Sequence, residues 1–250
     1  MDMDIDIDMD IDIDMDMSMD MDMDINMDGD KRPNGYPFYA VLSRMKYINR
    51  WGLMRNNRNE NIQEHSLQVA IISHALALMR NRYFGGNVDA DRVAVISLFH
   101  DCDEILTGDM PTPVKYFNDG ILCAYREVGD VAKDRLLSML PEGLRADYEG
   151  LFYRDGRSAT PGPAGSCIRS ECSPPCRPEG GGLVWDLVKA ADTICAYIKC
   201  LEEIAGGNTE FAAAAKSTRM KLDAIDLPEV QMFIREYISA FSLSLDEFGI

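Results

Sequence analysis

The 250-residue sequence has no uninterrupted run of the roughly 18 apolar residues that a membrane-spanning helix requires. Its first residues are acidic, so it also lacks the basic start and continuous apolar core of a secretory signal peptide. Its seven cysteines are odd in number and form no short disulfide framework. We therefore expect neither a membrane span nor a signal peptide, and a cytoplasmic location in which the thiols stay reduced.

Residues 1–30 contain no lysine or arginine and consist mainly of 13 aspartates that alternate with methionine and isoleucine. They carry most of the formal charge of −17, because the remaining chain has 29 of the 42 acidic residues against all 25 basic ones. Like charges at every second position oppose folding, so we expect residues 1–32 to form a disordered, low-complexity tail. The mildly acidic remainder argues against a nucleic-acid polymer as partner.

Alternating apolar and polar runs, which are typical of β-strands, are missing from residue 33 onward. Apolar residues instead recur at helical spacing, which predicts helices at 37–49, 63–80, 89–104, 120–140, 183–205, 209–223 and 228–243. The segment 63–80 is apolar on most sides, which predicts a buried, central helix. The long helix 183–205 should end at the glycine pair that follows it. We expect one all-α domain over residues 33–250.

One segment interrupts this pattern, because residues 156–182 are rich in glycine, proline, serine and cysteine. Such a composition cannot form an amphipathic helix, so we interpret about 154–182 as a loop insertion within the domain. Cys167, Cys172 and Cys176 lie there, but their spacing lacks a fourth ligand and matches no common zinc motif. We therefore expect no zinc at these cysteines.

The chain has only three histidines, and two of them suggest a metal site. His100 is followed by Asp101 at the edge of an apolar helix, where an ionised carboxylate needs a partner. A hydrogen-bonded His–Asp pair would satisfy it, and so would a divalent metal ion. With His65 and Asp192 on two other apolar helices, the set becomes two imidazoles and two carboxylates, which suits Mn²⁺, Co²⁺, Fe²⁺ or Zn²⁺. His74 lies on the opposite side of the helix from His65, so we interpret it as structural.

The order His, His-Asp, Asp is typical of HD-domain phosphohydrolases, and the residues around these positions sharpen the likeness. The sequence resembles the bacterial HD-domain 5'-deoxynucleotidase (YfbR) family from about Pro37 to Tyr153 and again from near Leu183 to the C-terminus. Four stretches carry the resemblance most clearly: LSRMKYINRWGLMRN at 42–56, ENIQEHSLQVA at 60–70, FHDCDEILTGDMPTPVKYF at 99–117 and KAADTICAYIKCLEE at 189–203.

The resemblance implies a role for each matching residue. The implied metal ligands are His65, His100, Asp101 and Asp192. Arg50 would orient the phosphate, Trp51 would pack against the sugar and exclude a 2'-hydroxyl, Glu104 would act as general acid or base, and Asp109 would contact the nucleoside. The implied substrate-binding set is Arg50, Trp51, His65, Asp101, Asp109 and Asp192. Without the resemblance, Arg50 and Glu104 would be interpreted as solvated residues at helix ends, Trp51 as core and Asp109 as a turn residue.

The implied reaction is the hydrolysis of 2'-deoxynucleoside 5'-monophosphates to deoxynucleosides and phosphate. It would need a divalent metal ion, Co²⁺, Mn²⁺ or similar, and no organic cofactor, and the enzyme would be a homodimer. Two alternatives stay open: another HD nucleotide phosphohydrolase, namely a deoxynucleoside triphosphohydrolase or a phosphodiesterase, and an inactive nucleotide-binding HD scaffold. The sequence departs from the family just after Tyr153, where the family has an acidic loop with a histidine and an aromatic residue near the substrate.

Overall fold

The computed structural model describes residues 35–153 and 182–249, and within these ranges all regular structure is helical apart from one bridge between Asn49 and Asn61. The α-helices are α1 (Phe38–Leu42), α2 (Ile62–Tyr83), α3 (Ala90–Phe99), α4 (Glu104–Thr107), α5 (Thr112–Lys115), α6 (Asp119–Ser138), α7 (Glu142–Phe152), α8 (Leu183–Ala205), α9 (Ala212–Asp223) and α10 (Pro228–Glu236). Four 3₁₀ segments accompany them: η1 (Ser43–Tyr47), η2 (Thr209–Phe211), η3 (Ile238–Ser242) and η4 (Leu245–Phe248). The all-α prediction is confirmed, whereas the predicted tail (1–32) and almost all of the predicted insertion (154–182) lie outside the described residues.

The predicted boundaries hold best where a clear signal marks a helix end. Helix α8 has the predicted bounds and stops at Gly206 and Gly207, and Gly207 adopts a positive φ of 85°, which glycine tolerates. The start of the predicted helix 89–104 also holds: Asp89 caps α3, and its carboxylate accepts a hydrogen bond from the Arg92 backbone.

The predicted helix 89–104 is wrong in its last part. Helix α3 ends at Phe99, and a turn follows before α4 begins at Glu104. The Ser97 carbonyl accepts from both the backbone N–H and the Nδ1 of His100, so the chain tightens there into i→i+3 hydrogen bonds instead of continuing the helix. His100 and Asp101 therefore lie in a turn between two helices, and Glu104 starts a new helix instead of extending the face of His100.

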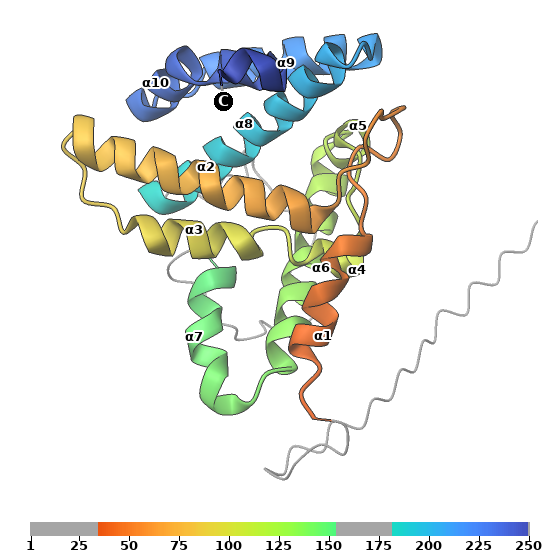
Figure 1. Cartoon of the computed structure of the whole chain (residues 1–250). Helices are drawn as coiled ribbons and strands as arrows, with labels where there is room; N and C mark the ends of the chain where they lie inside the picture. The colour runs from red at the N-terminus through yellow and green to blue at the C-terminus, as the bar shows by residue number, and fades with distance from the viewer. Residues whose placement is uncertain (1–34, 154–181, 250) are drawn as a thin grey trace, which may run out of the picture. The chain divides into compact units, whose positions relative to one another are not determined.

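Helices α2, α3, α8 and α10 enclose the main hydrophobic core. Helices α2 and α3 run side by side, α8 crosses behind them, and α10 packs against α2 on the other side (Figure 1). The side chains that fill the space between these helices are aliphatic and fully buried, among them Val69, Leu76, Val93, Ile96, Leu187, Ile194, Ile198 and Val230. This core fixes α2 relative to α8, and those two helices carry the first and last of the predicted metal ligands.

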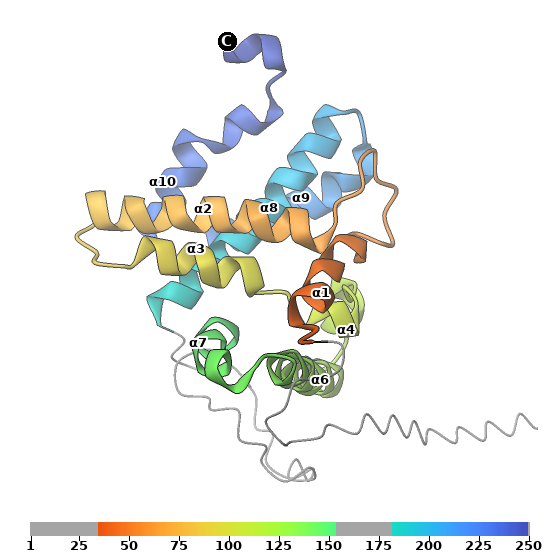
Figure 2. The ribbon, with the colours of Figure 1, turned by 60° about the horizontal axis from the view of Figure 1, so that its bottom comes forward.

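A second, aromatic core lies where α1, α6 and α7 meet the end of α3 (Figure 2). The ring of Phe38 contacts Tyr148 edge-on at 5.0 Å between centroids, and Phe99 stacks on Phe152 at 5.7 Å. Tyr153 is buried in the same cluster and donates a hydrogen bond to Asp134 at 2.6 Å. Tyr153 therefore belongs to the core, and the predicted family departure begins after it.

Helix α2 is less buried than its apolar sequence predicted. One of its faces is exposed although it carries large apolar side chains: Leu67 is 55% exposed and Ile71 60%. The remaining faces contact α3, α8, α10 and η1, as expected of a central helix. No helix in the described ranges is long and apolar enough to cross a bilayer.

The connection between η1 and α2 is tied to the end of α8 by a buried ionic network. The Glu203 carboxylate accepts hydrogen bonds from the backbone N–H groups of Asn57 and Arg58 and from the side chain of Asn208. The ammonium group of Lys199 donates to the same carboxylate and to the carbonyl of Arg58. Charged groups that satisfy each other in this way hold a loop far more firmly than exposed ion pairs do.

This network should make stability depend on pH in a defined way. Burial alone would raise the pKa of Glu203, but the bonds from Lys199, Asn57, Asn208 and Arg58 lower it from 4.5 to about 2. The stabilisation, roughly 3 kcal/mol, is complete above the unfolded pKa and is lost as the pH falls through the folded one. We expect Glu203→Gln to lower the free energy of unfolding by roughly this amount at pH 7 and by less than half of it at pH 3.

Urea unfolding of wild type and variant at both pH values measures this difference. Glu202→Gln is the matched control, because burial raises the pKa of Glu202 and its removal should cost no stability at pH 7. A Glu203→Gln deficit that stays constant between pH 7 and pH 3 would contradict the role of the network.

Candidate functional site

The described fold brings three of the predicted ligands, His65, His100 and Asp101, into one group, and Asp192 joins it through its contact with His65. His65 lies in the first turn of α2, His100 and Asp101 in the turn after α3, and Asp192 in the middle of α8. His65 Nε2 is 3.0 Å from Asp192 Oδ1 and 3.8 Å from Asp101 Oδ2, and His100 Nε2 is 3.1 Å from the same Asp101 oxygen. One ligand atom each from His65, His100 and Asp101 lies within 4.8 Å of the others, close enough to share an ion.

The orientation of His100 fits a metal ligand. Its Nδ1–H donates to the Ser97 carbonyl at 2.7 Å, which fixes the ring and turns Nε2 toward the cluster. There Nε2 is buried and has no properly aligned hydrogen bond to any residue in the described ranges, although Asp101 is near. A backbone acceptor behind the ring and an unsatisfied nitrogen in front of it are typical of histidines that bind metals. The two imidazole rings face each other with centroids 5.4 Å apart.

The charges in the cluster also suit a cation. Burial and the neighbouring Arg50 lower the pKa of His65, so its imidazole is neutral and can donate a lone pair. Burial would raise the pKa of Asp101, but the His100 charge, His65 and Arg50 lower it, so the carboxylate is ionised. The pKa of His100 rises to about 9 against the effect of burial, chiefly because of Asp101. A divalent cation would take the place of that proton.

Arg50 is neither solvated nor on the surface. Its side chain is 13% exposed, and Nη1 lies 3.5 Å from Asp101 Oδ2, beside the cluster. Burial would lower its pKa, but the charges of Asp192, Asp101 and Glu60 outweigh this and raise it. The guanidinium is therefore a permanent cation at the edge of the candidate metal site.

Trp51 and Asp109 lie next to this arginine. Trp51 is half-buried, and its ring packs on Phe211 with centroids 5.4 Å apart. The Asp109 carboxylate accepts a hydrogen bond from the Trp51 backbone, which lowers its pKa, although burial and Asp101 raise the pKa overall. Trp51 thus packs against a small core cluster and also lies beside the candidate site, which are the two positions that the sequence interpretations gave it.

Glu104 is buried, contrary to the solvated alternative. It is 6% exposed, and its Oε2 has no hydrogen-bond partner among the residues that the structure describes. Burial, together with the charges of Asp101 and Asp109, raises its pKa to about 10. A carboxyl group that is protonated at neutral pH beside ionised carboxylates is suited to donate a proton.

Sequence reasoning missed Glu60. Its carboxylate accepts a hydrogen bond from the indole N–H of Trp51 and lies 3.3 Å from Arg50 Nε. The only signal for it was its position inside the stretch 60–70, which carries the family resemblance, immediately before the cap of α2. An acidic residue in a polar loop has no pattern that distinguishes it from a solvated one.

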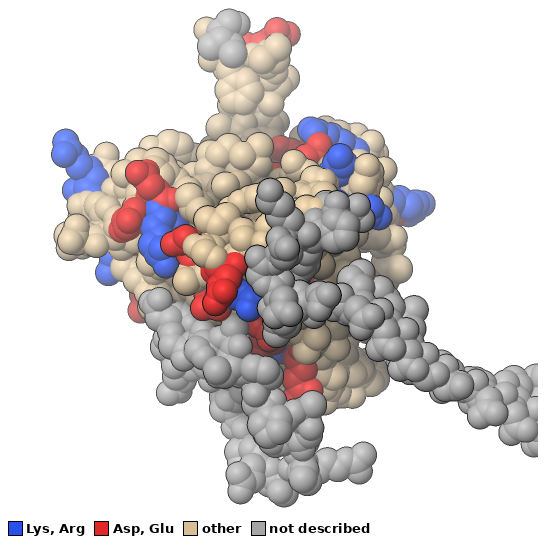
Figure 3. All heavy atoms as spheres, turned by 90° about the horizontal axis from the view of Figure 1, so that it is seen from below, with Lys and Arg blue, Asp and Glu red and all other residues tan. Residues whose placement is uncertain are grey.

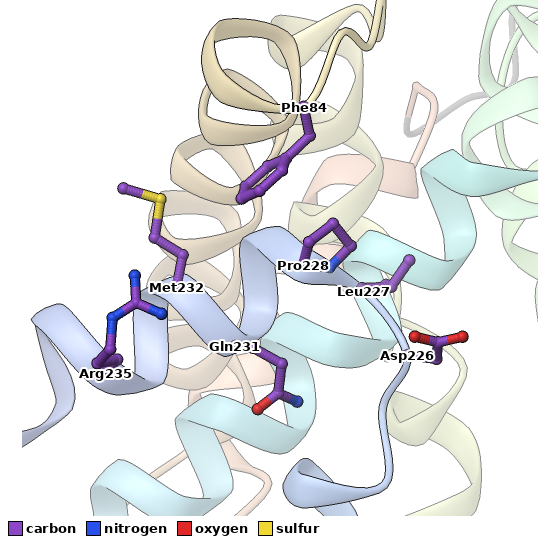
Figure 4. A pocket seen from close by; sticks show the side chains of 7 residues that line it. All are labelled: Phe84, Asp226, Leu227, Pro228, Gln231, Met232 and Arg235. Atoms are coloured by element: carbon purple, nitrogen blue, oxygen red, sulfur yellow. The ribbon is translucent and has the colours of Figure 1, made fainter.

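Two other features lie apart from the cluster. His74 contacts Asp91 at 3.5 Å on the exposed side of α2, as expected for a residue outside the site. A hollow of about 530 Å³ lies between the end of α2 and α10 (Figure 4), lined by Phe84, Asp226, Leu227, Pro228, Gln231, Met232 and Arg235. It contains no histidine or cysteine and only one acidic residue, so the chemistry of the chain places the candidate site at the His65 cluster.

Comparison with solved structures shows the same fold. An HD-domain phosphohydrolase of Listeria innocua is 19% identical with a TM-score of 0.63, over 82% of this chain and 87% of the other. A protein of Pyrococcus horikoshii is 17% identical with a TM-score of 0.55, over 82% of this chain and 98% of the other. The fold is therefore that of the HD-domain class.

Sequence comparison is more specific. The model of the 5'-deoxynucleotidase YfbR-like family matches residues 37–163 and 177–241. The 5'-deoxynucleotidase YfbR of Escherichia coli (strain ATCC 8739) is 44% identical over 214 residues, which cover 84% of this chain and 94% of the relative. The chain belongs to the 5'-deoxynucleotidase YfbR-like family, and the resemblance inferred from its motifs is confirmed.

The cluster should hold metal only while its ligands are intact. We expect protein purified with Mn²⁺ or Co²⁺ to retain about one ion per chain, and His100→Ala or Asp192→Asn to retain far less, because each removes a donor atom. Elemental analysis after desalting measures the content. His74→Ala is the matched control, since it removes a histidine outside the cluster. Equal metal content in His100→Ala and His74→Ala would exclude a metal site here.

Proposed function

We propose that this protein hydrolyses 2'-deoxynucleoside 5'-monophosphates to a deoxynucleoside and phosphate. The observation that carries the proposal is the group formed by His65, His100 and Asp101, with Asp192 against His65, beside a buried arginine and a half-buried tryptophan. The names of the family and of its Escherichia coli relative describe this activity for those proteins.

His65, His100, Asp101 and Asp192 hold the metal ion in this proposal. A bound divalent cation supplies polarisation of a phosphate oxygen and lowers the pKa of water toward neutrality. Nitrogen and carboxylate ligands without thiolate suit Co²⁺ or Mn²⁺, and no organic cofactor is needed. His65, Asp101 and Asp192 thereby also lie against the substrate phosphate.

The other residues bind the substrate and move the proton. Arg50, beside Asp101, is placed to bind phosphate oxygens through its fixed fork of donors and to stabilise their charge. Trp51 and Asp109 face the nucleoside, the ring of Trp51 limiting the space at the 2'-position. Glu104 holds a proton in a water-poor environment and gives it to the leaving oxygen.

A phosphate-release panel tests the proposal. We expect wild-type protein with Mn²⁺ or Co²⁺ to release phosphate from dAMP, dGMP and dTMP faster than from AMP and GMP. Glu104→Gln should lower kcat by about 10²- to 10⁴-fold, the range of general acid–base catalysis. Glu64→Gln is the matched control, because that carboxylate on α2 is 49% exposed and pairs only loosely with Arg58.

The same panel decides between the alternatives. Hydrolysis of deoxynucleoside triphosphates or cyclic nucleotides, with none of the monophosphates, would identify the protein as another HD nucleotide phosphohydrolase. Nucleotide binding without any phosphate release would identify an inactive scaffold. The intact ligand set and the buried Glu104 support the active enzyme.

We further propose a homodimer formed through α2 and α3. Large apolar side chains are exposed along one face of each helix; we call them the α2–α3 stripe, and they are Leu67, Ile71, Leu78, Val95 and Leu98. The contact between His74 and Asp91 shows that the two faces adjoin. Exposed apolar side chains on two adjacent, antiparallel helices are typical of a protein interface.

Disruption of the stripe should separate the subunits. We expect wild-type protein to have the mass of a dimer by light scattering after size exclusion, and Ile71→Glu to have that of a monomer, because a buried unpaired charge opposes association. Met220→Glu on α9, where the side chain is 64% exposed, is the control and should remain dimeric. A dimeric Ile71→Glu protein would place the interface elsewhere.

The surface and the cysteines support the remaining expectations. On the face drawn in Figure 3, basic and acidic side chains are interspersed among uncharged ones, which does not favour a nucleic-acid polymer as partner. Cys102, Cys195 and Cys200 are buried free thiols. We propose a cytoplasmic location, where such thiols stay reduced.

A further inference from the structure

Glu60 contacts three residues of the proposed site with one carboxylate. Its Oε2 accepts a hydrogen bond from Trp51 Nε1 at 3.0 Å and lies 3.3 Å from Arg50 Nε. Its Oε1 faces the back of His65, 3.8 Å from Nδ1. The Glu60 side chain is 12% exposed, so water competes little for these contacts.

Trp51 has a backbone conformation that needs such support. Its φ is 58°, and it is the only non-glycine residue with positive φ in the ranges that the structure describes. A bulky residue in this region is strained and keeps the conformation only where its surroundings hold it. The Trp51 carbonyl accepts from the Met54 backbone at 2.9 Å, its own N–H bonds to Asp109, and Glu60 holds the indole.

The loop itself is closed without the Glu60 side chain. The Arg50 N–H donates to the Glu60 carbonyl and the Ile62 N–H to the Ile48 carbonyl, each at 2.9 Å. The far part of the loop is tied to α8 through Glu203. The Glu60 carboxylate is therefore not required to fold the loop, and its contacts serve the orientation of Arg50 and Trp51.

We propose that Glu60 is a positioning residue that sets the guanidinium plane of Arg50 and the indole plane of Trp51 with one shared carboxylate oxygen. This rests on the proposed function, in which Arg50 binds the phosphate and Trp51 excludes the 2'-hydroxyl. Because one oxygen restrains both side chains, affinity for the phosphate and selection against ribose depend on the same residue.

Two substitutions separate the two contacts. Glu60→Gln keeps an acceptor oxygen for the indole but removes the negative charge beside Arg50, so we expect KM for dAMP to rise about tenfold to a hundredfold with a smaller change in kcat. Glu60→Ala removes both contacts and should in addition lower the ratio of kcat/KM for dAMP to that for AMP. Glu64→Gln and Glu64→Ala are the matched controls, because Glu64 lies four residues after Glu60 and is 49% exposed outside the site.

A readout without substrate makes the test independent of the proposed function. In a Trp185→Phe background Trp51 is the only tryptophan, and we expect its fluorescence anisotropy to fall in Glu60→Ala but not in Glu64→Ala. Circular dichroism spectra and melting temperatures identify a variant that merely fails to fold, and Glu60→Gln, which keeps size and an acceptor, then carries the test.

The outcomes are distinct. A raised KM, a reduced preference for dAMP and a lower anisotropy support the proposal. Glu60 variants that match the Glu64 variants in all three measurements overturn it. In that case hydrolysis of dAMP by the wild-type protein would still support the proposed function. If wild-type protein hydrolyses none of the nucleotides, the proposed function fails, and the anisotropy alone decides whether Glu60 holds Trp51.

Discussion

The site depends on one electrostatic constraint: two ionised carboxylates, Asp101 and Asp192, lie beside two buried imidazoles. The two carboxylates repel each other, and Arg50 is the permanent positive charge that lies beside Asp101 in the described part of the chain. In the described structure a proton on His100 and the hydrogen bond from His65 to Asp192 hold the pair. The same requirement for positive charge suits the cluster to a divalent cation. The cation, together with Arg50 beside it, would offset the negative charge of a phosphate.

The fold satisfies this constraint by bringing together the first turn of α2, the middle of α8 and the turn between α3 and α4. Asp192 is fixed in the middle of α8, whose apolar side packs against α2, so His65 in the first turn of α2 is held opposite it. His100 and Asp101 come from the break between α3 and α4, where the chain leaves the helical path and the two adjacent side chains turn toward the same group. The aromatic core around Phe99 anchors that break from below.

The sequence predicted the parts of this arrangement that leave a periodic or a motif signal. Helical spacing was enough for the all-α class and for α8 with its glycine stop, and the rarity of histidine drew attention to the correct residues. It could not predict the end of α3, because Val93 to Phe99 continue a good helical pattern and only the bond from His100 to the Ser97 carbonyl ends it. Nor could it predict the exposed face of α2, since an apolar side chain has the same signature in a core and in an interface. Glu60 was missed because its importance lies in contacts across a loop, which composition does not encode.

The loop from Arg50 to Glu60 explains how an interruption after Tyr153 can be compatible with an intact site. The proposed metal ligands, the pair Arg50 and Trp51, and the proposed proton donor Glu104 all lie outside residues 154–181. Arg50 and Trp51 are restrained inside their own loop by the backbone conformation of Trp51 and by the shared oxygen of Glu60. Glu203 of α8 restrains the same loop from outside. In the proposed function, recognition of the phosphate and of the sugar therefore rests on segments that the two hydrophobic cores hold in place. In that proposal, selectivity for deoxyribose depends on the backbone conformation of Trp51 and on the Glu60 carboxylate that contacts its indole.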